Sequence, residues 1–144
     1  MATILERAAP SCIEDWFLEV QLDSKLSHVP LTPEQRCHHL PQLFRDLVAR
    51  LRAARPLGSK GPLSPFAENH GLTRRQQGYS AAMMVEESRI LQVCIFHTLD
   101  KNLASIDFSL LLSQVMIIAD EVDSQLRQAM ECYVEESILD TLPA

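Results

Sequence analysis

Residues 107–140 read DFSLLLSQVMIIADEVDSQLRQAMECYVEESILD and contain neither glycine nor proline. Apolar side chains recur here at spacings of three and four residues, which is the repeat of one helix face. The pattern predicts a single helix over about 107–140. Such a helix spans roughly 50 Å, whereas a domain of this size is about 30–35 Å across. We therefore expect its last turns to project beyond the core, where Gln125 and Gln128 interrupt the apolar stripe and acidic residues become frequent, or else to fray or bend near Ser124.

The rest of the chain also has helical periodicity and almost no alternating strand pattern. Several helix boundaries are marked by cap residues followed by proline, by an internal proline, or by glycine. The sequence PLGSKGPL, residues 56–63, predicts a loop. We expect helices over about 12–26 with Ser11 as N-cap, 33–40 after Thr32, a new helix from the break near Leu40 and Pro41 to about Arg55, 65–77 before Gly78, and 80–103 with Ser80 as N-cap.

These elements predict an all-α, single-domain bundle of five or six helices over residues 1–144, with a globin-like arrangement as one form. The chain has 144 residues, of which 47% are hydrophobic and 22% charged, enough for one full core. Its net charge of −6 argues against nucleic-acid binding, which requires a cationic surface. We expect no signal peptide and no membrane span, and the four widely spaced cysteines favour a reducing, cytoplasmic setting.

Charge is distributed unevenly along the chain. Residues 104–144 hold one basic side chain, Arg127, against eight acidic ones. A basic group occurs earlier, accompanied only by Asp46; it consists of Arg45, Arg50, Arg52, Arg55 and Lys60. The two regions can attract each other within one chain or across a dimer, or they can be two solvated helix faces.

The segment ENHGLTRRQQGYSAAMMVEESR, residues 68–89, contains the candidate functional residues. A glycine inside a helix costs about 1 kcal/mol relative to alanine, so Gly71 indicates close helix packing or a bend. Arg74 follows His70 by four residues and shares its face. We expect Glu86, on the next antiparallel helix, to lie opposite Arg74, with Tyr79 nearby. This arrangement is either a polar pocket or switch, or a satisfied structural network.

The order H-G-x-x-R-x-x-x-G-Y, after an earlier H-L-P, resembles the N-terminal domain of RsbRD-type RsbT co-antagonist proteins. The residues that carry the resemblance are His39-Leu40-Pro41, His70, Gly71, Arg74, Gly78, Tyr79, Glu86 and Arg89. The resemblance covers about residues 16–133. It implies an all-helical, dimeric signal-input domain, related to globin-like sensor domains without haem, that precedes an output domain such as a histidine kinase.

Other chemistries have weaker support in the sequence. His97, with Ile90 and Val93 on its face, is the candidate for an alternative haem-binding function. The Cys37-His38-His39 cluster cannot converge on a metal alone, because adjacent helical residues point about 100° apart. No catalytic signature occurs, so we expect a non-enzymatic domain with no cofactor and no metal.

The predicted function is therefore a bacterial sensor domain that forms a homodimer and acts on a downstream signalling domain. A ligand or partner near His70, Arg74, Tyr79 and Glu86 would change the packing of 65–77 on 80–103, and 107–140 would transmit that change. The alternatives are a haem or small-molecule-binding domain and a structural dimerisation module.

Overall fold

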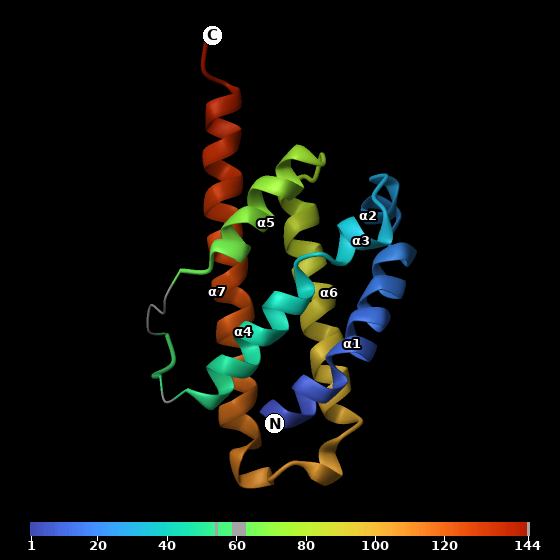
Figure 1. Cartoon of the computed structure of the whole chain (residues 1–144), viewed down its shortest axis with the longest axis vertical. Helices are drawn as coiled ribbons and strands as arrows, with labels where there is room; N and C mark the ends of the chain where they lie inside the picture. Colours follow the sequence, from blue (N-terminus) through green and yellow to red (C-terminus); the bar gives the residue numbers. More distant parts are fainter. Residues whose placement is uncertain (54, 59–62, 144) are drawn as a thin grey trace.

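The computed structural model describes residues 1–53, 55–58 and 63–143, and among these it contains helices and turns but no strand (Figure 1). Five helices have 12 or more residues and two have five, which confirms the predicted all-α bundle. In chain order they are α1 (Ala2–Leu22), α2 (Ser24–His28), α3 (Pro33–Cys37), α4 (Leu40–Arg52), α5 (Pro65–Gln76), α6 (Ala81–Asp100) and α7 (Phe108–Asp140), with a 3₁₀ turn over Leu103–Ser105.

The helices pack along one another around a core to which several of them contribute side chains. α5 lies along α7, α1 packs against both α6 and α4, and α7 also contacts α4 and α6. Fully buried side chains from α1, α4, α6 and α7 meet between them, including Trp16, Leu47, Ile95 and Ile118. In the described part of the chain, no helix combines the length and hydropathy needed to cross a bilayer.

The predicted helix starts after the first are confirmed, while three predicted ends lie three residues too far along the chain: the helices end at Cys37, Arg52 and Asp100 instead of near Leu40, Arg55 and Leu103. The Thr32 side chain accepts a hydrogen bond from the Gln35 backbone N–H, and the Gln35 side chain accepts from the Thr32 N–H, so α3 begins with a capping box. Ser64 and Ser80 cap α5 and α6 in the same position. Gly78 has φ +95°, a conformation that favours glycine, and it follows the end of α5. Residues 56–58 and 63 are not helical; the remainder of the predicted loop, 59–62, lies outside the described residues.

The prediction for the first helix is wrong at both ends. α1 begins at Ala2 instead of Cys12 and continues through Pro10, and the Ser11 hydroxyl donates to the Ala8 carbonyl instead of capping. Burial of Ile4 and Leu5 favours these early turns and offsets the hydrogen bond that a proline cannot donate. The segment 12–26 also contains a break, because the Asp23 carboxylate accepts from the N–H groups of Lys25 and Leu26 and starts α2.

The long last helix is confirmed, and Figure 1 shows its C-terminal turns extending past the other helices. The expected thinning of its stripe at Gln125 and Gln128 is wrong, because both side chains are buried. Gln125 Nε2 donates to Asp46 at 3.1 Å, and Gln128 Oε1 accepts from the Ser64 N–H at 2.7 Å. Polar partners on α4 and before α5 thus keep α7 in the bundle as far as Tyr133.

The basic and acidic regions meet within one chain. Arg50 Nη2 lies 3.6 Å from an Asp120 carboxylate oxygen, and Arg55 Nη2 lies 3.4 Å from Glu121. Two other members of the basic group have partners outside the acidic region: Arg52 pairs with Glu6 on α1, and Arg45 bonds to Gln42. Lys60 lies outside the described residues.

Candidate functional site

A buried carboxylate, Glu87 on α6, is the centre of a polar cluster between α3–α4, α5 and α6. Its side chain is 4% exposed, and Oε1 lies 3.2 Å from Arg74 Nε and 3.0 Å from His70 Nε2. The backbone carbonyl of Glu87 also accepts a hydrogen bond from the indole of Trp16 on α1. Burial acts to raise the pKa of Glu87, but the His70 hydrogen bond and the Arg74 charge outweigh it and hold the pKa well below its ordinary value. Glu87 is therefore a buried anion.

Arg74 on α5 joins this anion to the α3 segment. Its Nη2 donates to the Arg36 carbonyl at 2.6 Å, and its Nη1 donates to the Gln35 carbonyl and the Gln77 side chain. The guanidinium carbon lies 4.8 Å from the centre of the Tyr79 ring. The side chain is 1% exposed, so these partners replace the water that a buried cation loses.

Arg36 on α3 extends the network toward α2. Its guanidinium donates to the carbonyls of Leu26 and Val29 and to the Tyr79 hydroxyl. Burial, with the nearby Glu87 charge, raises the pKa of Tyr79, so this phenol stays protonated. Tyr133 on α7 donates in turn to the Tyr79 carbonyl at 2.7 Å. The network therefore reaches from α2 to α7.

Two imidazoles close the other side of Glu87. The rings of His39, in the α3–α4 turn, and His70, on α5, are stacked with centroids 3.7 Å apart and planes 15° apart. His39 Nε2 lies 3.7 Å from Glu87 Oε1. Burial lowers the pKa of His70, and burial together with the neighbouring His70 lowers the pKa of His39 further. Both rings are therefore neutral at pH 7.

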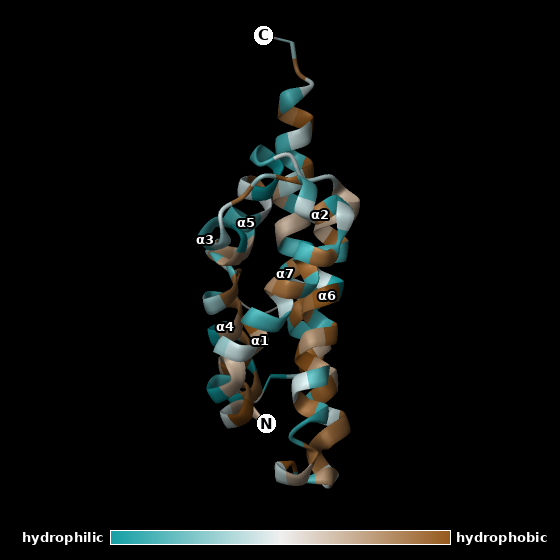
Figure 2. Cartoon of the chain, turned by 90° about the vertical axis from the view of Figure 1, so that its right-hand side faces the viewer, coloured by the Kyte–Doolittle hydropathy of each residue, from teal (hydrophilic) through white to brown (hydrophobic). Residues whose placement is uncertain are grey.

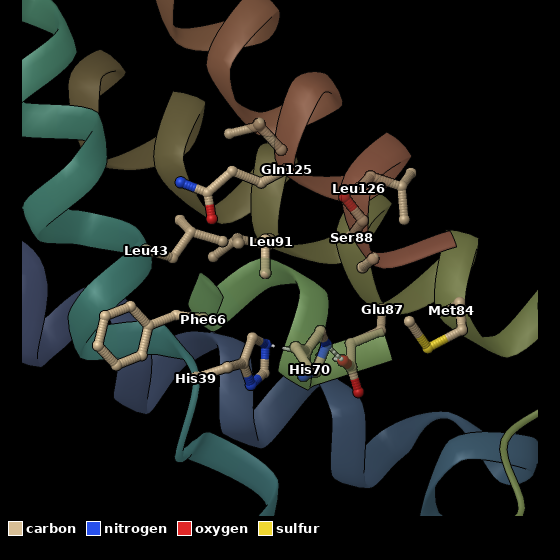
Figure 3. A pocket seen from close by; sticks show the side chains of 13 residues that line it. His39, Leu43, Phe66, His70, Met84, Glu87, Ser88, Leu91, Gln125 and Leu126 are labelled. Carbon is tan, nitrogen blue, oxygen red and sulfur yellow. Dashed lines mark hydrogen bonds and ion pairs between the residues drawn. The ribbon is translucent and has the colours of Figure 1, made fainter. Parts of the chain in front are cut away.

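A small pocket lies beside the stacked rings (Figure 3). It has a volume of about 40 Å³, which holds an ion with one or two waters but no organic ligand. The polar side of its wall consists of His39, His70 and Glu87, while Val122, Gln125 and Ala129 contribute an α7 side. The cluster thus faces α7 across a small cavity.

Gly71, next to His70, lies at a close approach between α5 and α7. A Cβ atom added at Gly71 would lie 1.9 Å from the Ala129 carbonyl oxygen, well inside van der Waals contact. This confirms close helix packing as the reason for the mid-helix glycine. The backbones of α5 and α7 therefore touch one residue away from the cluster.

The structure brings together only some of the predicted site residues. His70, Arg74 and Tyr79 join one network, Gly71 packs beside it, and Gly78 ends α5. The prediction that Glu86 lies opposite Arg74 is wrong: Glu86 is about one-third exposed and pairs with exposed Arg89 three residues later. The inward position is Glu87, one residue or about 100° around the helix.

Accessibility also changes the expected site. Arg74 and Tyr79 are about 1% exposed, so the ligand-accessible part is the pocket at His39 and His70 instead. His97 and Val93 are exposed while Ile90 is buried, so the face proposed for a haem ligand points to solvent.

Glu87, Arg36 and Trp16 were not placed in the site from the sequence, and His39 was named in the His39-Leu40-Pro41 motif and in the Cys37-His38-His39 cluster without being placed beside His70. The signal for Glu87 was present, since it continues the buried Met84–Leu91–Ile95 repeat. His38 is exposed and Cys37 half-buried, which confirms that these neighbours diverge from His39.

No protein-family model matches the chain, and no curated protein or solved structure matches it either. The RsbRD-type resemblance and a globin-like arrangement therefore remain predictions from the sequence.

Proposed function

We propose that this chain is a non-catalytic signal-input domain of a bacterial regulatory protein, in which α7 transmits the state of the Glu87 cluster to an output domain such as a histidine kinase. One observation carries the proposal: a single buried carboxylate is bound by side chains from α5 and the α3–α4 turn, directly beside the α5–α7 backbone contact. The resemblance of the His70–Tyr79 motif to RsbRD-type domains supports the same class.

The expected packing of 65–77 on 80–103 is replaced by packing of α5 on α7, while α5 reaches α6 through the bonds of His70 and Arg74 to Glu87. The proposed mechanism is therefore a population shift between two positions of α5 on α7, set by these bonds to Glu87. A change in the bonds between Glu87 and the two histidines alters the position of α5 in the bundle. Because Gly71 touches the Ala129 backbone, α7 follows any displacement of α5. Arg75, bonded to Ser137 and Asp140, connects α5 to α7 further along, and Tyr133 connects α7 to Tyr79 in the turn between α5 and α6.

We also propose that the domain acts as a cytoplasmic homodimer. The first turns of α7 expose an apolar series at four-residue spacing: Phe108 is 71%, Leu112 is 72% and Met116 is 46% exposed. Figure 2 shows hydrophobic residues on the ribbon at the end of the bundle where α6 ends and α7 begins. Exposed apolar rows of this kind are typical of interaction surfaces.

The test is a chimera in which the full chain replaces the input domain of a sensor histidine kinase, joined in helical phase after α7. We expect His70→Gln, which changes the bonds to Glu87, to alter reporter output at unchanged protein level. Glu86→Gln, on the adjacent but outward position, is the matched control and should keep the wild-type output.

A structural dimerisation module would behave differently in the same assay. His70→Gln would then lower the melting temperature of the purified chain without changing the output of the chimera. That result, with folding confirmed by circular dichroism, would overturn the proposed function.

A further inference from the structure

We propose that His39, His70 and Glu87 bind a divalent transition-metal ion of the zinc class through two imidazole nitrogens and one carboxylate oxygen. One donor atom from each residue lies within 4.8 Å of the other two. His70 Nε2 and His39 Nε2 lie 3.0 and 3.7 Å from Oε1 of the Glu87 carboxylate, so both imidazoles already stand beside the group that would bind the ion.

Glu87 has an unused binding atom in this place. Its Oε1 accepts from Arg74 and His70, but buried Oε2 has no hydrogen-bond partner among the described residues. His39 Nδ1 is likewise buried without a partner in the described structure. Buried polar atoms without partners are uncommon and costly, and a cation on Oε2 would give this oxygen a partner while Arg74 keeps Oε1.

The donor set indicates which cations bind. Two nitrogens with one oxygen suit Zn²⁺, Co²⁺, Ni²⁺ and Cu²⁺, whereas Mg²⁺ and Ca²⁺ prefer oxygen ligands alone. A metal ligand must be unprotonated at the binding atom, so His70 Nε2 gives up its hydrogen bond to Glu87 Oε1 if this nitrogen binds the ion. The adjoining cavity of about 40 Å³ leaves room for a water as fourth ligand.

Two features of the cluster reduce the affinity. The positive charge of Arg74, 3.2 Å from Glu87 Oε1, repels a second cation. The stacked rings must also rotate, because parallel imidazoles cannot direct both lone pairs at one ion. This rotation links binding to structure, since it moves His70 beside the α5–α7 contact. The metal's role as the signal rests on the function proposed above; its binding does not.

The binding experiment titrates Co²⁺ into the metal-free full chain, with all cysteines kept reduced. We expect 1:1 binding with visible absorption bands of low-coordinate cobalt, displaced by Zn²⁺ but not by Mg²⁺ or Ca²⁺. His39→Ala and His70→Ala should each weaken binding at least tenfold. His38→Ala, adjacent to His39 but exposed, is the matched control and should bind like wild type. His39→Gln replaces His39→Ala if the latter does not fold.

Three results would overturn the metal site: no saturable 1:1 binding, equal binding by the His39 and His38 variants, or thiolate-to-cobalt charge-transfer bands from cysteine ligation. If binding fails while His70→Gln still alters the chimera output, the metal inference is wrong and the sensor proposal stands. If Zn²⁺ binds but changes neither hydrogen exchange in α7 nor chimera output, the site stands and the metal is not the signal.

Discussion

Two neighbouring glutamates, Glu86 and Glu87, have opposite roles in this molecule. Glu87→Gln keeps the size of the side chain but leaves buried Arg74 without its counter-charge, a change that costs about 3–5 kcal/mol of unfolding free energy. Glu86→Gln removes only a solvent-exposed pair with Arg89 and should change stability by less than about 0.5 kcal/mol. Urea unfolding of both variants measures the difference, and equal stabilities would contradict the central role of Glu87.

Replacing the glycine beside His70 with alanine changes the stability in opposite directions, depending on whether helix propensity or the packing of α5 on α7 dominates at this position. In an exposed helix, replacing glycine with alanine stabilises by about 1 kcal/mol. Gly71→Ala instead forces a methyl group onto the Ala129 carbonyl and should destabilise by about 1–3 kcal/mol. Thermal unfolding tests this against Gln76→Ala, an exposed substitution on the same helix. A stabilised Gly71→Ala variant would refute the close α5–α7 contact.

Only some of the individual site residues could be predicted from the sequence. His70, Arg74 and Tyr79 could be grouped because they follow one another closely on α5 and its end. Glu87 was also accessible to periodicity, since Met84 and Leu91 on its face are buried. Arg36 could not be found, because two of its three acceptors are main-chain carbonyls, of Leu26 and Val29, and a backbone acceptor cannot be inferred from residue type.

Among the elements, α7 offers a direct test of self-association. If the exposed series on its first turns forms the dimer interface, Leu112→Glu places a charge in an apolar contact and should weaken association at least tenfold. Light scattering over a concentration series measures this. Ser113→Glu, its exposed neighbour, is the control. A wild-type chain that stays monomeric at high concentration would contradict the homodimer.

Helix boundaries were predictable where local chemistry specifies them, as at the capped starts of α3, α5 and α6. They were not predictable where tertiary burial overrides a local signal. Pro10 and Ser11 look like a helix start, yet Ile4 and Leu5 extend α1 through them by packing in the core. The burial of Gln125 and Gln128 could not be predicted either, because their partners Asp46 and Ser64 are distant in sequence.

For the molecule as a whole, the reaction rates of the cysteine thiols should report which of them are buried in the core. All four cysteines are free; Cys12 and Cys94 are buried, and burial raises the pKa of Cys94 to about 11 and that of Cys12 above its ordinary value. We expect both to react at least about tenfold more slowly than half-buried Cys132 with a disulfide reagent at pH 8. Mass spectrometry of the labelled native chain measures the order, with urea-unfolded chain as control. Equal rates in the native chain would contradict the core.

The contact between Gly71 and Ala129 restricts how the long helix can move. The atoms of α7 nearest to a Cβ added at Gly71 are the carbonyl oxygen, carbonyl carbon and Cα of Ala129, so the two helices meet here backbone to backbone. A displacement of α5 at this point would press directly on the main chain of α7. Beyond the crossing, Tyr133 bonds to Tyr79, and Ser137 and Asp140 bond to Arg75. The C-terminal end of α7, about 16 Å further along its axis at 1.5 Å per residue, would therefore move together with α5 and the turn that follows it.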